Sequence, residues 1–174
     1  KDISTGRLLI DEPKEDIFSS SLDKNVVSLT MLEIITNALE EQKDGLVRVK
    51  LEEREERAIF SVINKGSVNF DVLRQKAIEA AQNGKLVHKN DLYAISDNIR
   101  YQQVSVEEVK LMKDEELLFV VNLTTRENKH GCRGRGLACV FNEVVVKEKG
   151  ELNVKSENGQ VTVTVILDAD KIGS

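Results

Sequence analysis

The sequence is organised around one stretch, Asn122-Leu-Thr-Thr-Arg-Glu-Asn-Lys-His-Gly-Cys-Arg-Gly-Arg-Gly-Leu-Ala-Cys-Val140. It joins the pair Thr124 and Thr125 to a basic loop that contains Gly134 and Gly136, and then to an apolar helix start. Glycines lack a Cβ, so the backbone can approach an anion closely, and the N-terminus of the following helix directs free N–H groups toward it. The stretch therefore predicts a phosphate-binding turn, with an ordinary strand-to-helix turn as the alternative.

Composition limits the classes of protein that fit this chain. A length of 174 residues suits one domain, or one domain with an insertion, and with no Trp and 4% aromatics the core must be built from Val, Leu and Ile. The net charge of −5 argues against a nucleic-acid partner, although Lys129, Arg133 and Arg135 make one loop basic. Cys132 and Cys139 lack histidines at ligand spacing, which fits a reducing compartment. With no membrane-span pattern and no leader pattern, we expect a cytoplasmic protein.

Apolar periodicity predicts the order of strands and helices. The expected strands are 6–10, 46–51, 58–63, 151–156 and 161–167. The charged run 52–57 is expected to form the turn between the second and third, and Asn158-Gly159 predicts a tight hairpin between the last two. The expected helices are 23–43, 70–82, 91–99, 106–112 and 137–147. The apolar residues 117–121 are expected to return to the core. This order predicts an α+β fold, a two-layer sandwich of one mixed β-sheet with helices on one face.

Two further stretches carry side chains that suit nucleotide chemistry. Glu33 and Asn37 lie four residues apart on the first predicted helix, and Asn64 and Gly66 follow the third predicted strand. The amide oxygen of Asn37 is a hard neutral ligand for Mg²⁺, and Glu33 is placed to orient or deprotonate an attacking hydroxyl. Asn64 offers an acceptor for the exocyclic amine of adenine, and Gly66 lets the base lie against the backbone. The alternatives are a solvated helix face and an ordinary turn.

The order of these stretches resembles the Bergerat-fold ATPases, the GHKL superfamily of gyrase, heat-shock chaperones, histidine kinases and MutL. Leu32–Leu39 is similar to the N-box of that family, Ser61–Gly66 to its first glycine box, and Gly134–Val140 to its second. The closest likeness is to the ATP-binding domain of CheA-type chemotaxis histidine kinases. Residues 116–125 and 150–167 are similar to its apolar-then-threonine segment and to the closing hairpin of kinase domains.

The resemblance implies a single kinase-type domain over residues 1–174, with a core at 6–82 and 115–168 and a helical lid at 83–130. It implies that the domain binds ATP and Mg²⁺ and passes the γ-phosphoryl group to a histidine on a separate domain. Glu33 and Asn37 would be catalytic, with Asn37 as the metal ligand. The nucleotide-binding residues it implies are Asn64, Gly66, Thr124, Thr125, Arg133, Gly134, Arg135 and Gly136.

The same resemblance implies partners in two-component and chemotaxis signalling. These are a phosphoacceptor histidine domain, a response regulator, and receptor or coupling proteins. Dimerisation is expected through domains outside this chain. A serine kinase of the anti-sigma type shares the Glu–Asn pair, but the long insertion before the glycine loop argues against it.

Four positions depart from the family pattern. Asn64 stands where the first glycine box usually has aspartate, and Val68 replaces its second glycine. Cys132 stands where the second box often has glycine, and Glu33 stands where CheA-type kinases commonly have histidine. These departures keep an alternative open, in which the chain is a degenerate nucleotide-binding or protein-interaction module without kinase activity.

Overall fold

The computed structural model describes residues 8–11, 24–42, 45–55, 57–87, 102–120, 123 and 136–168. The chain forms two compact units. The first comprises Lys1–Val68 and Glu143–Ser174, and the second comprises Asn69–Asn142. Each unit is described by itself below.

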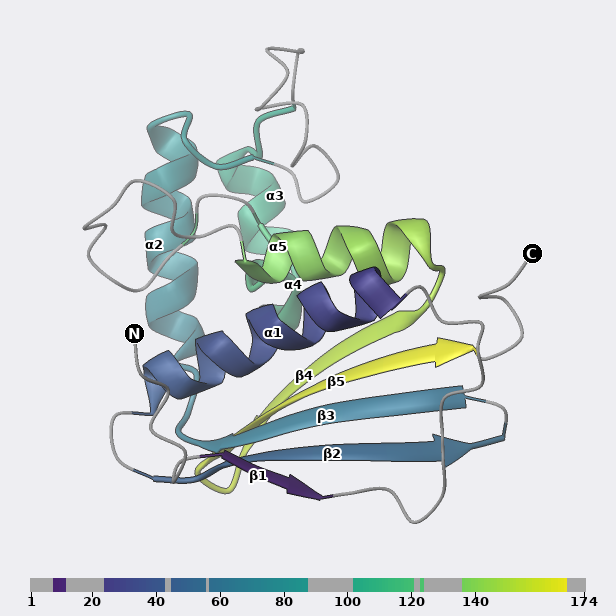
Figure 1. Cartoon of the computed structure of the whole chain (residues 1–174). Helices are drawn as coiled ribbons and strands as arrows, with labels where there is room; N and C mark the ends of the chain where they lie inside the picture. The colour runs from purple at the N-terminus through teal and green to yellow at the C-terminus, as the bar shows by residue number, and fades with distance from the viewer. Residues whose placement is uncertain are drawn as a thin grey trace. The chain divides into compact units, whose positions relative to one another are not determined.

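The first unit contains one mixed five-stranded sheet (Figure 1). The sheet order is β1-β2-β3-β5-β4, in which β1 is parallel to β2 and every other neighbouring pair is antiparallel. The strands are β1 (Leu8–Asp11), β2 (Val47–Arg54), β3 (Arg57–Lys65), β4 (Glu151–Glu157) and β5 (Gln160–Asp168). The predicted mixed sheet is confirmed.

Both predicted hairpins form, but one is tighter than the sequence suggested. Asn158 and Gly159 have φ angles of 52° and 71°, the left-handed pair that a two-residue hairpin turn requires. The prediction that 52–57 forms the β2–β3 turn was wrong, because Glu53 pairs with Ala58 and Arg54 pairs with Arg57. A charged run can continue a strand when its backbone hydrogen bonds are completed by the neighbouring strand.

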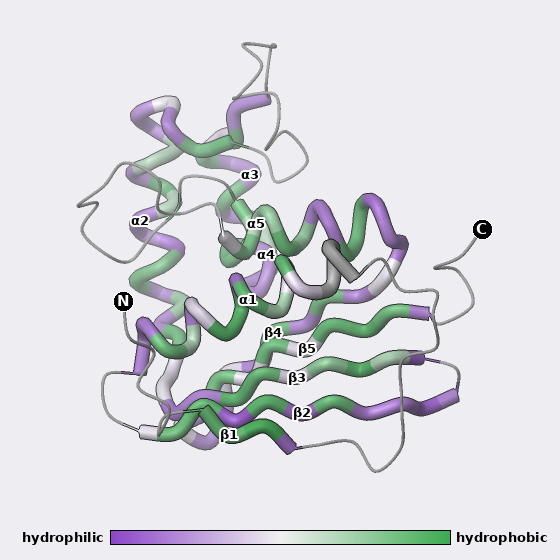
Figure 2. The backbone as a smooth tube through the Cα atoms, in the orientation of Figure 1, coloured by the Kyte–Doolittle hydropathy of each residue, from purple (hydrophilic) through white to green (hydrophobic). Residues whose placement is uncertain are grey.

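Helix α1 (Lys24–Glu41) lies across one face of this sheet and contacts β2 and β3 (Figure 1). Its buried positions Thr30, Ile34 and Ala38 are four residues apart, the spacing of one helix face. Hydrophobic residues recur along β2, β3 and β5 (Figure 2). The predicted helix on one face of the sheet is therefore confirmed, whereas its proposed start at Asp23 lies outside the described residues.

The second unit is helical. It contains α2 (Phe70–Gln82), α3 (Val106–Leu111), α4 (Asp114–Leu117) and α5 (Gly136–Phe141). The Asn69 side chain caps α2 by accepting a hydrogen bond from the backbone nitrogen of Val72, and a capping box begins α3. The predicted helices at 70–82 and 106–112 are confirmed to within one residue. The predicted helix at 91–99 lies outside the described residues.

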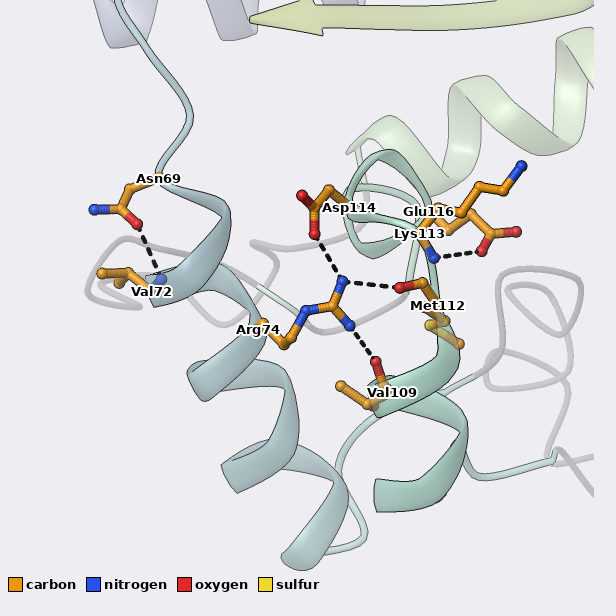
Figure 3. A network of polar contacts seen from close by, with 8 residues as sticks. All are labelled: Asn69, Val72, Arg74, Val109, Met112, Lys113, Asp114 and Glu116. Carbon is orange, nitrogen blue, oxygen red and sulfur yellow. Dashed lines mark hydrogen bonds and ion pairs between the residues drawn. The ribbon is translucent and has the colours of Figure 1, made fainter.

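One arginine joins three helices of the second unit. Arg74 on α2 donates hydrogen bonds to the carbonyl oxygens of Val109 and Met112, at 2.5 and 2.8 Å, and to Oδ1 of Asp114 at 2.7 Å (Figure 3). Its planar guanidinium thereby satisfies carbonyl groups at the end of α3, which no helical amide can reach. The same group holds the first residue of α4.

Two apolar stretches differ from their predicted form. Residues 117–120, expected to return to the core, do so with Leu117, Phe119 and Val120 buried, although they form the end of α4 and a turn. The helix predicted at 137–147 is divided into α5 and the π-helix η2 (Asn142–Lys147). A π-helix depends on a local shift of hydrogen-bond register, which apolar periodicity does not reveal.

Candidate functional site

The candidate site of the first unit is the turn that follows β3. Asn64 pairs with Val161 of β5 through its backbone, and its side chain is 7% exposed. It lies on the same strand face as the buried residues Phe60 and Val62, because alternate residues of a strand share a face. Nδ2 of Asn64 donates a long hydrogen bond of 3.5 Å to the Lys65 carbonyl. Within the described ranges, Oδ1 of Asn64 accepts no hydrogen bond, so this oxygen is available to a ligand.

Three backbone amides fix the turn after Asn64. Lys65 donates to Oε1 of Gln42 at 3.0 Å, Gly66 to the Gly159 carbonyl at 2.9 Å, and Val68 to Oγ of Ser156 at 2.9 Å. The acceptors come from the end of α1, from the β4–β5 turn and from β4. Three hydrogen bonds from other segments therefore fix the turn in the absence of ligand. A turn that is already ordered loses less conformational entropy when a ligand binds.

Gly66 has a backbone conformation that favours glycine. Its φ of 156° is one that L side chains rarely adopt, so any other residue would strain the turn. A Cβ at this position would lie 3.7 Å from Nδ2 of Asn64. Glycine here both permits the turn and leaves the space beside the Asn64 amide open. The role of Gly66 in admitting a base stays a prediction.

Glu33 and Asn37 both lie on α1, and both are partly buried. They border the stripe of Thr30, Ile34 and Ala38 that is buried on α1. Neither side chain makes a hydrogen bond or an ion pair with any residue that the structure describes. Their polar atoms are therefore uncommitted within this part of the chain, as binding or catalysis would require.

The other predicted site residues are placed only in part. Gly136 is the first residue of α5 and belongs to the second unit. The remaining predicted positions lie outside the described residues, and they are Thr124, Thr125, Arg133, Gly134 and Arg135. Glu33 and Asn37 on α1 and Asn64 and Gly66 after β3 all belong to the first unit, and their joint role as a site stays a prediction.

Two residues of this site had no signal in the sequence. Gln42 and Ser156 both accept hydrogen bonds from the turn after Asn64, and Gln42 is only 5% exposed. A glutamine at a helix end and a serine in a charged strand usually face solvent. Their roles depend on the packing of α1 and β4 beside the turn, which is a property of the tertiary structure.

The described residues contain no group of three or more His, Cys, Asp or Glu side chains that could hold a metal ion. A metal at this site would therefore take a protein ligand such as Asn37 together with ligands from a bound molecule and water, the pattern typical of Mg²⁺. As to membranes, the helices found in the described ranges are all too short or too polar to cross a bilayer.

No family model matches the chain, and no curated protein matches it in sequence. Solved structures do match. Over 95% of this chain and 81% of that one, the chain superposes on a nucleotide-free catalytic domain of histidine kinase ThkA, with a TM-score of 0.61 and 13% sequence identity. This chain has the fold of a histidine kinase catalytic domain.

A second nucleotide-free form of the same kinase domain gives a TM-score of 0.59 over 92% of this chain and 78% of that one, again at 13% identity. This fold agrees with the predicted α+β sandwich of one mixed sheet with helices. At this identity the likeness concerns the fold, and the roles of single residues rest on the geometry of the turn and of α1.

Proposed function

We propose that this chain is the ATP-binding catalytic domain of a CheA-like histidine kinase. In this proposal it binds Mg-ATP and supports transfer of the γ-phosphoryl group to a histidine on a separate domain. The observation that carries the proposal is the uncommitted side-chain oxygen of Asn64, a buried residue in a turn whose amides are held by three other segments. That turn occurs in a histidine kinase catalytic-domain fold, beside a helix that presents Glu33 and Asn37.

The adenine base is the ligand group that fits the Asn64 turn. Its exocyclic amine donates a hydrogen bond, and Oδ1 of Asn64 is an acceptor without a donor among the described residues. Gly66 has no side chain to fill the space beside this amide, so a flat ring can approach the backbone. An amide lacks the charge of a carboxylate, which makes its hydrogen bonds about half as strong as charge-assisted ones.

The phosphates and Mg²⁺ are assigned to other residues of the proposed site. Asn37 would hold Mg²⁺ through its amide oxygen, and Glu33 would orient the accepting group. Bound Mg²⁺ would neutralise charge on the phosphates. The predicted phosphate and lid contacts complete the proposal, and they are Thr124, Thr125, Arg133, Gly134, Arg135 and Gly136.

The proposal extends to partners and location. It includes a phosphoacceptor histidine domain, a response regulator, receptor or coupling proteins, and the cytoplasm as the compartment. A histidine kinase catalytic-domain fold supports the first of these in general terms, because such a domain needs a histidine to modify. Purified phosphoacceptor domains incubated with this chain and labelled ATP would identify the partner.

Titration of ATP in the presence and absence of Mg²⁺ tests the proposal directly. We expect saturable binding that is tighter with Mg²⁺. Asn37→Ala should remove most of the Mg²⁺ effect and leave Mg²⁺-free affinity nearly unchanged, whereas Asn64→Ala should weaken binding in both conditions. If ATP fails to bind at millimolar concentration with or without Mg²⁺, the proposed function is wrong.

The alternative is a module that kept the fold and lost catalysis. It is favoured by three departures from the family pattern, which are Asn64, Val68 and Cys132. Asn64→Asp separates the two ideas. A large gain in ATP affinity would indicate a decayed site, and no gain or a loss would indicate a site adapted to asparagine.

The proposed lid at residues 83–130 also has a test. Residues 88–101, 121, 122 and 124–130 of this segment lie outside the described ranges, so the lid rests on sequence. We expect a non-hydrolysable ATP analogue with Mg²⁺ to slow protease cleavage within 83–130. Cleavage that proceeds at the same rate with and without the analogue would contradict a lid in this segment.

A further inference from the structure

Gln42 is a buried polar residue immediately after the last residue of α1. Its backbone nitrogen donates to the Ala38 carbonyl at 3.0 Å, so it continues the helical hydrogen bonding. Its side chain is almost fully buried, and Oε1 accepts the hydrogen bond of the Lys65 backbone nitrogen at 3.0 Å. A buried glutamine at a helix end is unusual, and this one has a specific acceptor role.

The neighbouring turn confines the Gln42 side chain. Gly45 has a φ of 134°, and a Cβ at this position would overlap Nε2 of Gln42 and lie 3.1 Å from its Cδ. The amide of Gln42 therefore passes against the bare backbone of Gly45 on its way to Lys65. A larger residue at position 45 would therefore displace the Gln42 carboxamide from its place beside the Lys65 amide.

The Gln42 hydrogen bond joins the two parts of the proposed nucleotide site in the first unit. Asn37 lies five residues before Gln42, which is roughly 7–8 Å along a helix axis. The Lys65 amide lies between Asn64 and Gly66 in the chain. The Lys65 carbonyl, on the next peptide plane, accepts the hydrogen bond from the Asn64 side chain. The Gln42 side chain thus links α1, which carries the proposed metal ligand Asn37, to the turn that carries the proposed adenine acceptor Asn64.

We propose that Gln42 is a positioning residue for nucleotide recognition. By holding the Lys65 amide it fixes the peptide that joins Asn64 to Lys65, adjacent to the peptide whose carbonyl accepts the hydrogen bond of the Asn64 carboxamide, and it thereby sets the position of Asn64 relative to α1. Without this acceptor, the Lys65 amide loses its partner in a part-buried position, and the peptide rotates to find another. The inference rests on the proposed binding of ATP, but the hydrogen bond itself can be tested without ligand.

Two variants and one control isolate the hydrogen bond. Gln42→Met keeps the length and burial of the side chain without a strong acceptor, and Gln42→Glu keeps an acceptor oxygen in the same place. Gln82→Met is the matched control, because Gln82 is an exposed glutamine at the last position of α2. Circular dichroism of each variant establishes that it is folded before its binding is compared.

The first measurement is amide hydrogen exchange of the ligand-free protein by NMR. Loss of one hydrogen bond should speed exchange of the Lys65 amide about tenfold in Gln42→Met. The Val62 amide in the middle of β3 should be unaffected, and Gln42→Glu and Gln82→Met should exchange at Lys65 as the unaltered protein does. Unchanged Lys65 exchange in Gln42→Met would overturn the inference.

The second measurement separates base recognition from phosphate binding. Gln42→Met should weaken ATP about tenfold while it leaves inorganic triphosphate with Mg²⁺ within about twofold, and Gln42→Glu should restore ATP binding. A general loss of structure would weaken both probes alike, and that result would overturn the positioning role. If unaltered protein fails to bind ATP, the proposed function and this role are both wrong. If it binds ATP and Gln42→Met binds equally well, only this role is wrong.

Discussion

Thr30 and Asn64 are buried residues of the first unit, and each has a side-chain oxygen that accepts no hydrogen bond in the described part of the chain. The consequences for the protein differ between the two. Asn64 lies at the end of a strand, where its oxygen can reach a ligand. Thr30 lies in the middle of α1, is 5% exposed, and its hydroxyl has no hydrogen-bond partner in the described part of the chain. It shares the buried stripe with Ile34 and Ala38. Burial of an unsatisfied hydroxyl opposes folding, so Thr30 is a weak point of this core.

Thr30→Val should stabilise the protein. Valine has nearly the same shape and removes the unsatisfied hydroxyl, so we expect the free energy of unfolding to rise by about 1 kcal/mol. Urea denaturation followed by circular dichroism measures the change. Thr36→Val on the exposed face of the same helix is the control and should stay within about 0.5 kcal/mol. A loss of stability in Thr30→Val would mean that the hydroxyl has a partner in the folded protein.

Among the helices of the second unit, Arg74 connects α2 to the short helices α3 and α4. Helices α3 and α4 are only six and four residues long, below the length at which a helix is stable alone. Arg74 is 26% exposed at its side chain and binds Val109, Met112 and Asp114 at once (Figure 3). These contacts stabilise the connection between α3 and α4, which two such short helices cannot stabilise by themselves.

Arg74→Lys should loosen this joint. A lysine ammonium is a point charge and cannot match the fork of the guanidinium, so we expect a loss of about 1–2 kcal/mol in stability. Hydrogen exchange should quicken at the Met112 and Leu118 amides, whose bonds close α3 and α4. Arg54→Lys in the exposed pair with Glu52 is the control and should change little. Equal effects of the two substitutions would contradict a special role for Arg74.

For the whole molecule, binding of the proposed ligand should raise the free energy of unfolding. A ligand that binds only the folded state stabilises it in proportion to the logarithm of its concentration, by about 2.7 kcal/mol at one hundred times its dissociation constant. The residues of the first unit that would bind ATP come from α1 and from the turn after β3, so binding should stabilise that unit.

Mg-ATP should therefore raise the midpoint of thermal unfolding, with a shift that grows with ATP concentration. Differential scanning fluorimetry over a range of Mg-ATP concentrations measures it. Asn64→Ala should show a much smaller shift at the same concentrations, because its adenine acceptor is missing. An identical shift in Asn64→Ala would argue that ATP binds elsewhere on the chain.

Local sequence determined much of this fold. The Asn158-Gly159 turn, the capped helix after Asn69 and the strands of the sheet were all predicted, because each depends on turn chemistry, capping or apolar alternation over a few residues. The residues of the candidate site on α1 and after β3 were also identified from sequence, through their order and spacing.

The tertiary structure decided what depends on contacts between distant segments. Met31 and Ile35 of α1 are apolar yet only partly buried, whereas the polar residues Thr30 and Gln42 are buried in line with Ile34 and Ala38. Strand pairing extended β2 and β3 into their charged turn, and the packing of α1 beside β3 gave Gln42 its contact with Lys65. These outcomes depend on hydrogen bonds and burial between residues that are far apart in the sequence. A local pattern of residues does not predict such contacts.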